Sequence, residues 1–564
     1  MPSICDRNIT KEVITQLEHA PQPPKSQLLE VRFGAVKDLH GEPSGIFKEP
    51  HDEAIYVGLT GLAGDEHVYA PHGGVERAVM QYDADHYADW RCESSPFPDL
   101  FQLGDFGENL VATGMTEANV CVGDLYRVGK EVVLQVSEPR DPCYKLNKRF
   151  QWPRALKRIT RTGRVGWLMR VLQTGYIRKG DEMVLLERPH PQWSLLNVKR
   201  VVQGKSVPLE LVQELMELDV LTETVRGYAA KRMLTATKRY RLVSAENVTS
   251  RVKHLTFELD EHNLVIHKPT FPAYSFAKID FGPDFSISRS YSIVSGDMNR
   301  FTLGVALDDN TRGGSSYIHS KLALGDEIRM TPGSDPAGIE AEEKCTPDAI
   351  DNRIIIIGGI GVTAFLPSID LCEAQNLPYE VHYAVRSPED AAFVDRIPSS
   401  RLKLYAKTQQ KRLDVQELIP PPSESDGRFT TRIFTCGPNR LMDTVREHAA
   451  RLGYPPHLLH FESFEGAGKA AKDSKPFNVT VHDEEAGRSV QLRVEADKTL
   501  LRTLRDAGFD MTYLCERGGC GACKVAVAKG EVCHNGMGLL EKERGDYMLS
   551  CVDRAVTDIE ILYD

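Results

Sequence analysis

Four cysteines near the C-terminal end of the chain have a spacing that suits one-electron chemistry. Cys515, Cys520 and Cys523 form a C-x4-C-x2-C run, and Cys551 stands apart later in the sequence. A loop that supplies three thiolates and a later segment that supplies the fourth suit a [2Fe–2S] cluster. The glycines of this loop can adopt positive φ and let backbone N–H groups face the cluster sulfurs. A four-cysteine zinc site is disfavoured because such sites normally use two short pairs.

The residues around these cysteines resemble the plant-type ferredoxin domain. The segment that begins at Cys551 matches the part of that family that delivers the last ligand, and the similarity covers about residues 476–564. A strand is expected near 490–496, followed by a helix near 499–505. The resemblance implies an α+β β-grasp fold. Cys533 and His534 lie between the third and fourth ligands and are interpreted as bystanders.

A strand with alternating chemistry predicts a flavin site. Within residues 288–293, Arg289 offers bidentate donors for a phosphate, Tyr291 a π-surface for a flavin ring, and Ser292 a hydrogen bond to it. A glycine-rich turn follows about twenty residues later and is expected to bind phosphate through Gly313, Gly314 and Ser315. A strand followed by a turn could equally form a plain β-hairpin.

A continuous apolar run that ends in glycines predicts a dinucleotide site. Residues 353–357 are followed by the turn and helix start that contain Gly358, Gly359, Gly361 and Thr363. This is the crevice position of an open α/β sheet, where dinucleotides bind. A second strand precedes Arg386, whose cation could meet a 2′-phosphate, and a third ends in a Cys-Gly-Pro turn at Cys436.

Together these motifs resemble the ferredoxin–NADP reductase superfamily over about residues 238–464. The resemblance implies a flavin-binding β-barrel followed by an α/β NAD(P)-binding domain, with Cys436 near the nicotinamide. The order of flavin domain, nucleotide domain and C-terminal ferredoxin resembles phthalate dioxygenase reductase, which implies FMN, with FAD as the alternative. The choice between NADH and NADPH stays open.

Three motifs near the N-terminal end resemble the MOSC domain, which is named after molybdenum-cofactor sulfurase. They are His72-Gly-Gly74, Asp105–Leu110 and Pro139–Leu146, and the similarity covers about residues 28–189. The resemblance implies a β-barrel that binds a molybdenum cofactor. A helical tail after residue 193 resembles the small three-helix domain of bacterial MOSC proteins that reduce N-hydroxylated base analogues.

Cys143 is the residue expected to carry the chemistry of the MOSC part, because a thiolate is a good ligand for molybdenum. Arg140 and Lys145 would favour the thiolate and hold an anionic pterin phosphate. The alternative is a buried structural cysteine. The cofactor is also expected to be bordered by His72, Glu108 and Asn109. Each of these could instead brace a turn.

Composition bounds the remaining possibilities. The 564 residues are 41% hydrophobic and 26% charged, as in globular proteins with several domains. No apolar run approaches the ~20 residues that span a bilayer, so a cytoplasmic protein is expected. The net charge of −11 disfavours a nucleic-acid partner. The expected parts are a MOSC domain (1–190), a three-helix domain (191–235), a flavin barrel (236–345), an NAD(P) domain (346–464), a linker (465–475) and a ferredoxin (476–564).

These parts predict an oxidoreductase that needs no separate reductase. Electrons would pass from NAD(P)H through the flavin and the [2Fe–2S] cluster to molybdenum at Cys143, where N-hydroxylated small molecules would be reduced. One alternative is a reductase component that serves an external oxygenase, with the MOSC part as a docking module. Another is that the MOSC part is a sulfur or cofactor carrier.

Overall fold

The computed structural model divides the chain into two units. Unit 1 comprises residues 1–233 and 263–265, and unit 2 comprises residues 234–262 and 266–564. The residues described are 7–68, 73–93, 95–261, 264, 266, 270–272, 274–308, 313–344, 350–422, 428–464, 474–483 and 487–563. None of the helices within these ranges has the length and apolar character needed to cross a membrane.

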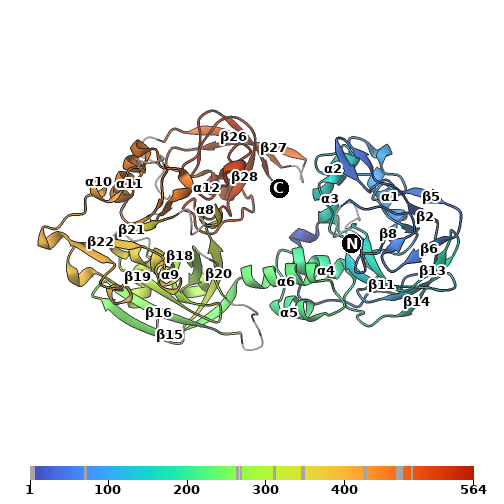
Figure 1. Cartoon of the computed structure of the whole chain (residues 1–564), viewed down its shortest axis with the longest axis horizontal. Helices are drawn as coiled ribbons and strands as arrows, with labels where there is room; N and C mark the ends of the chain where they lie inside the picture. Colours follow the sequence, from blue (N-terminus) through green and yellow to red (C-terminus); the bar gives the residue numbers. More distant parts are fainter. Residues whose placement is uncertain are drawn as a thin grey trace. The chain divides into compact units, whose positions relative to one another are not determined.

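Unit 1 is built on a nine-stranded mixed sheet (Figure 1). In spatial order its strands are β1 (Ser26–Gln27), β14 (Glu182–Glu187), β10 (Leu125–Val128), β11 (Val132–Pro139), β12 (Trp167–Gln173), β8 (Val79–Asp83), β9 (Leu110–Ala112), β2 (Glu30–Phe33) and β5 (Glu49–His51). A β-barrel is predicted here, but the described strands leave β1 and β5 as open edges. The smaller elements are β13 (Gly175–Ile177), β6 (Ile55–Gly58), β7 (Gly61–Leu62), β3 (Lys37–Leu39), β4 (Glu42–Ser44), α1 (Asp85–Arg91), α2 (Lys145–Arg149) and α3 (Ala155–Thr162).

Stacked aromatic rings form one core of unit 1. Tyr82 stacks on Phe106 with ring centroids 4.2 Å apart, and Phe101 stacks on Phe150 at 4.1 Å. Trp90 donates a hydrogen bond of 2.6 Å to the Tyr82 hydroxyl, so its one polar group is satisfied. This core anchors the loop of Phe106 and, through Phe150, the end of α2.

Three helices follow the sheet of unit 1, as the periodicity of the tail predicts. They are α4 (Leu195–Gln203), α5 (Leu209–Glu217) and α6 (Glu223–Thr235). Ser194 caps α4 by accepting a hydrogen bond of 3.1 Å from the Asn197 N–H. Both α4 and α5 bury an apolar stripe, which is the pattern of helices that pack on a domain.

Unit 2 begins with a closed six-stranded barrel. In order its strands are β15 (Lys238–Thr249), β16 (Val252–Leu259), β19 (Arg300–Ala306), β18 (Ile287–Gly296), β17 (Ser275–Phe281) and β20 (Glu327–Ser334). Inward residues such as Tyr240, Phe257 and Phe301 fill its interior. Helix α7 (Gly314–Ser320) follows β19, and α8 (Pro336–Lys344) follows β20.

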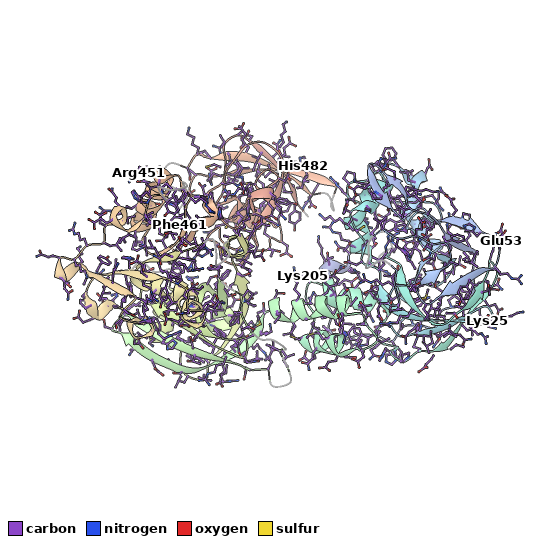
Figure 2. The ribbon with its side chains drawn as sticks, in the orientation of Figure 1. Lys25, Glu53, Lys205, Arg451, Phe461 and His482 are labelled. Atoms are coloured by element: carbon purple, nitrogen blue, oxygen red, sulfur yellow. The ribbon has the colours of Figure 1, made fainter. Side chains whose placement is uncertain are left out.

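A five-stranded parallel sheet comes next in unit 2. Its order is β23 (Leu402–Ala406), β22 (Glu380–Val385), β21 (Asn352–Gly358), β24 (Thr431–Cys436) and β25 (Leu459–Glu462), and its main helices are α9 (Val362–Ala374), α10 (Val415–Leu418) and α11 (Asn439–Leu452). Ile355 and Ile357 pack into one hydrophobic core, and Ile354 and Ile356 into another. Residues 354–357 of β21 are all isoleucine, which suits a strand with both faces buried. Phe461, on β25, packs against the second core (Figure 2).

The C-terminal part of unit 2 is a mixed sheet with one helix, α12 (Leu500–Asp506) (Figure 1). Its strands are β27 (Arg488–Val494), β26 (Phe477–Asp483), β32 (Ile559–Tyr563), β28 (Lys524–Lys529) and β30 (Tyr547–Leu549), with a small pair formed by β29 (Val532–Cys533) and β31 (Arg554–Ala555). Only β26 and β32 pair in parallel. The predicted strand and helix correspond to β27 and α12, and Thr499 caps α12 by accepting from the Arg502 N–H.

The Asp553 carboxylate holds the last loops of this sheet together. Asp553 is 1% exposed and accepts backbone hydrogen bonds from Asn535, Gly536 and Leu549 at 2.7–3.0 Å. The His534 ring makes a further contact at 3.1 Å. Buried donors need an acceptor, so this one side chain joins the segment at Asn535 and Gly536 to the end of β30.

Replacing Asp553 with Ala is expected to lower the free energy of local opening of these segments by about 2–3 kcal/mol, because buried N–H groups lose a charged acceptor. Hydrogen exchange of peptides that cover residues 533–538 and 547–553 measures this in the full chain. The control is Asp558→Ala, which removes an exposed acceptor for the Asn478 N–H. Equal protection in both variants would contradict the assignment.

Candidate functional site

The four predicted cluster cysteines come together as two pairs. The Cys515 and Cys520 side chains contact each other, and so do those of Cys523 and Cys551. Over the described ranges, no three His, Cys, Asp or Glu side chains are placed to hold a single metal ion. Two thiolate pairs suit two irons with two ligands each, whereas a zinc site needs four ligands around one ion. The residues therefore fit a [2Fe–2S] cluster.

Backbone groups and glycines shape the loop around the pairs. The Arg517 N–H points at the Cys515 sulfur, with N and Sγ 3.3 Å apart. The hydrogen bond from Cys520 lowers the pKa of Cys515 to about 5, and backbone N–H groups act in the same direction. Gly518 has φ of 76°, and a Cβ there would lie 2.5 Å from a Val552 methyl group. Only glycine fits this position.

The two residues interpreted as bystanders make contacts of their own. Cys533 is exposed on β29 and its thiol lies 3.7 Å from the Asn535 side-chain oxygen. His534 contacts Asp553 through Nδ1 and the Arg544 carbonyl oxygen through Nε2, at 3.1 and 2.9 Å. The sequence shows no sign of this bracing role of His534.

Arg289 and the glycine turn, both expected to bind the flavin phosphate, lie against each other. A Cβ at Gly314 would be 2.6 Å from the Arg289 Nε, so the arginine side chain crosses directly over the start of α7. Gly313 precedes the helix with φ of 85°, and the Ser315 hydroxyl accepts from the Asp308 N–H at 3.3 Å. A guanidinium beside a glycine turn is an arrangement that fits a phosphate group.

Tyr291 and Ser292 follow Arg289 on β18. Burial raises the pKa of Tyr291 to about 12, although the charges of Arg289 and Arg517 oppose this. The Ser292 hydroxyl donates a hydrogen bond of 3.1 Å to the Glu462 carboxylate. The site thus combines the cation of Arg289, the ring of Tyr291 and the glycine backbone of the turn. This combination fits FMN or FAD.

The glycine turn after β21 packs on the Cys-Gly-Pro turn after β24. A Cβ at Gly358 would lie 2.6 Å from the Pro438 ring, and one at Gly361 would collide with the Cys436 carbonyl oxygen. Thr363 is buried at the start of α9 and donates to the Ile360 carbonyl oxygen at 3.0 Å. Gly359, between these positions, has φ of 56°. These turns lie at the carboxyl ends of β21 and β24, where open α/β sheets bind ligands.

Cys436 is fully buried, and burial raises its pKa well above the usual range. Glu462 adds to this rise and is the register partner of Cys436 on β25. The sequence offers no spacing signal for Glu462, because only strand pairing brings it beside Cys436 and Ser292. Arg386, predicted near the nucleotide, is exposed just beyond β22.

Cys143 lies in the loop between β11 and α2 and is half-buried. Arg140 is 8% exposed and donates through Nη1 to the Phe106 carbonyl oxygen at 2.7 Å. Burial lowers the pKa of Arg140, whereas Cys143 and Glu108 favour its charged form. Lys145, expected to face the same anion, instead donates to the Pro43 carbonyl oxygen at 2.7 Å.

The two other described residues that were expected to border the molybdenum cofactor also brace the fold. Glu108 accepts from the Tyr87 hydroxyl and the Gly104 N–H, and its second carboxylate oxygen is buried without a partner in the part of the chain that is described. Asn109 accepts from the Met80 N–H at 3.0 Å and donates to Asp65 at 2.8 Å. His72 lies outside the described residues.

The helical tail of unit 1 reaches the Cys143 loop through Asp141. Tyr228 of α6 donates a hydrogen bond of 2.7 Å to the Asp141 carboxylate, and the Lys199 ammonium of α4 lies 3.9 Å from it. Thr222 donates to Glu138 at the end of β11. The sequence pattern predicts helices here but does not show that they hold this loop.

Two domain families match the chain. The MOSC domain matches residues 68–184, and the 2Fe-2S iron-sulfur cluster binding domain matches residues 483–556. The first range contains Cys143, and the second contains all four cysteines of the two pairs.

Comparison with known proteins extends these matches over the chain. A protein named "Reductase" from Gibberella moniliformis is 48% identical over 560 residues, which are 99% of each chain. Phthalate dioxygenase reductase of Burkholderia cepacia is 31% identical over 271 residues, 47% of this chain and 80% of that protein. The crystal structure of YiiM from Geobacillus stearothermophilus shows 30% identity, with 37% of this chain and 99% of that chain covered and a TM-score of 0.32.

The chain therefore belongs to the family of the Gibberella reductase and, over its reductase part, to that of phthalate dioxygenase reductase: it is an oxidoreductase with a MOSC domain, in which electrons pass from NAD(P)H through a flavin to a [2Fe–2S] cluster.

Proposed function

We propose that the protein is a self-sufficient NAD(P)H-dependent reductase that delivers electrons to a molybdenum cofactor at Cys143 and reduces N-hydroxylated compounds. The observation that supports this proposal best is the environment of the Cys143 thiol. Cys143 is half-buried beside the buried cation of Arg140, within a matched MOSC domain and in the same chain as a complete electron-supplying module.

The MOSC residues fit an anionic, thiolate-bound cofactor. Cys121 differs from Cys143 in exposure, because its thiol is buried. Cys143 is accessible by comparison, and Arg140 offers a positive charge held in place by the Phe106 carbonyl oxygen. Bound molybdenum would supply two-electron reduction of the substrate. The side chains of this chain would hold the cofactor, orient the substrate and exclude water.

In unit 2 the flavin would convert the two electrons of a hydride into single electrons for the cluster. Arg289 and the Gly313–Gly314 turn would hold the flavin phosphate, and Tyr291 would pack on its ring. FMN is our first choice and FAD the alternative. Gly358, Gly361 and Thr363 would shape the nucleotide site, with Cys436 beside the nicotinamide. Arg386 is exposed at the end of β22, where it can reach a 2′-phosphate, so NADPH and NADH are both candidates.

A second candidate function is the supply of electrons to a separate oxygenase. The relative from Burkholderia cepacia is named as the reductase of a dioxygenase. In that case the [2Fe–2S] domain would serve an external protein, and the MOSC domain would act as a docking or carrier module. Substitution of Cys143 separates the two functions.

Replacement of a cluster ligand is expected to remove the visible absorbance of the iron–sulfur cluster. Cys520→Ser and Cys551→Ser each break one thiolate pair and leave one iron with an incomplete ligand set. Cys533→Ser is the matched control, since Cys533 is exposed and lies in neither pair. Bleaching by Cys533→Ser with retained colour in Cys551→Ser would refute the pairing.

Arg289→Ala is expected to weaken flavin binding at least about tenfold, because a charge-assisted contact to the phosphate contributes roughly 1.5–3 kcal/mol. Flavin retained per chain after dialysis is the measurement. Arg329→Ala serves as a control, since Arg329 lies on β20, which β17 separates from β18, and its guanidinium lies over the Phe285 ring. Retention equal to the wild type would remove Arg289 from the site.

Cys143→Ala is expected to abolish NAD(P)H-driven reduction of a hydroxylamine or an N-hydroxylated base and to leave reduction of cytochrome c unchanged. The thiolate is the expected molybdenum ligand, whereas flavin and cluster precede it in the electron route. Cys92→Ala, which removes an exposed thiol elsewhere in unit 1, is the control. If Cys143→Ala retains both activities, the oxygenase-partner function becomes the better account.

A further inference from the structure

The loop that carries the first cluster ligand lies against the flavin barrel. The Ser290 hydroxyl of β18 donates to the Leu514 carbonyl oxygen at 3.4 Å, and the Lys278 ammonium of β17 lies 4.8 Å from the centre of the Tyr513 ring. Lys278 and Ser290 are direct register partners across the two strands. One cross-strand pair of the barrel therefore contacts two consecutive residues of the loop.

The Tyr513 ring also has a cation from its own domain. The Arg505 guanidinium, from α12, lies 4.2 Å from the ring centre. Cations are attracted to the face of an aromatic ring, and the attraction is stronger where water is partly excluded. Tyr513 thus contacts a cation of the barrel and a cation of the [2Fe–2S] domain through one ring.

These contacts are placed where they can control electron transfer. Tyr513 and Leu514 immediately precede Cys515, and Ser290 lies between the two residues expected to hold the flavin, Arg289 and Tyr291. The loop has a further contact beyond Cys515, where the Arg517 guanidinium lies 5.7 Å from the centre of the Phe464 ring. Contacts on both sides of Cys515 therefore hold the loop, one to the flavin strand β18 and the other to Phe464 after β25.

We propose that Tyr513 is a positioning residue, which the cations of Lys278 and Arg505 hold between the two domains so that the cluster stays within electron-transfer range of the flavin. The proposal rests on the proposed flavin site and is independent of molybdenum. In the step that it controls, the flavin loses one electron and one cluster iron gains it. No bond forms or breaks, and Tyr513 is neither oxidised nor reduced.

The test is rapid mixing of the anaerobic full-length holoenzyme with NADH or NADPH, with flavin reduction followed by absorbance and cluster reduction by freeze-quench EPR. Tyr513→Ala is expected to slow reduction of the cluster about tenfold, while Tyr513→Phe, which keeps the ring face, stays within about twofold of the wild type. Flavin reduction by the nucleotide should be unchanged in both. A cluster reduction rate in Tyr513→Ala equal to that of the wild type would overturn the proposal.

A substitution on the barrel side keeps the test decisive if Tyr513→Ala loses its cluster. Lys278→Met leaves the [2Fe–2S] domain sequence intact and should also slow cluster reduction, whereas Lys278→Arg retains the cation and should not. An unchanged rate in Lys278→Met would then overturn the proposal. The assay measures electron transfer only as far as the cluster, so a failure of the molybdenum function does not affect it. Absence of cluster reduction in the wild type would instead refute the route from flavin to cluster.

Discussion

A one-electron cluster must lie close to the group that reduces it. In unit 2 the loop of Cys515 must therefore lie against the flavin barrel. The loop packs closely on its own domain, because a Cβ at Gly518 would meet Val552 and one at Gly521 would meet the Gly538 carbonyl oxygen. Strand β18 contacts the loop through Ser290. Glu462 of β25 connects this strand to the nucleotide turns. It accepts a hydrogen bond from Ser292 and is the register partner of Cys436.

In unit 1, hydrogen bonds and ion pairs of charged side chains hold the loop of Cys143. Arg140 is buried and bonded to a backbone carbonyl oxygen, and Asp141 is held by side chains from two helices of the tail. The neighbours of the half-buried Cys143 thiol are thus held in place by the fold. The helical tail helps to hold this loop through Tyr228 and Lys199.

Much of this could be predicted because the signals are local. Cysteine spacing, the apolar run of β21 and the glycine turn after it follow from the covalent order of a few residues. The glycine-rich turn before α7 could be predicted in the same way. Lys145 also donates to a carbonyl oxygen of β4, a contact that the local sequence does not show. The expected MOSC β-barrel is seen in the described strands as a nine-stranded sheet with β1 and β5 at its edges, because alternating short strands do not show how a sheet ends.

The residues that sequence patterns missed depend on pairing between distant segments. Ser292 and Glu462 are 170 positions apart, and Ser290 and Leu514 are 224 apart. The hydrogen bonds to the Asp553 carboxylate and the hydrogen bond from Tyr228 to Asp141 also join separate segments of the sequence. No periodicity or spacing within one segment can reveal such contacts, because the fold of the whole unit creates them.

The proposed function requires one chain to carry both the electron supply and a molybdenum acceptor. Metal and flavin analysis of the purified full-length protein shows whether both are present. We expect two irons, about one flavin and about one molybdenum per chain, with molybdenum lost in a protein that lacks the Cys143 thiol. Full iron and flavin content without molybdenum, in cells that make the cofactor, would rule out the molybdenum acceptor.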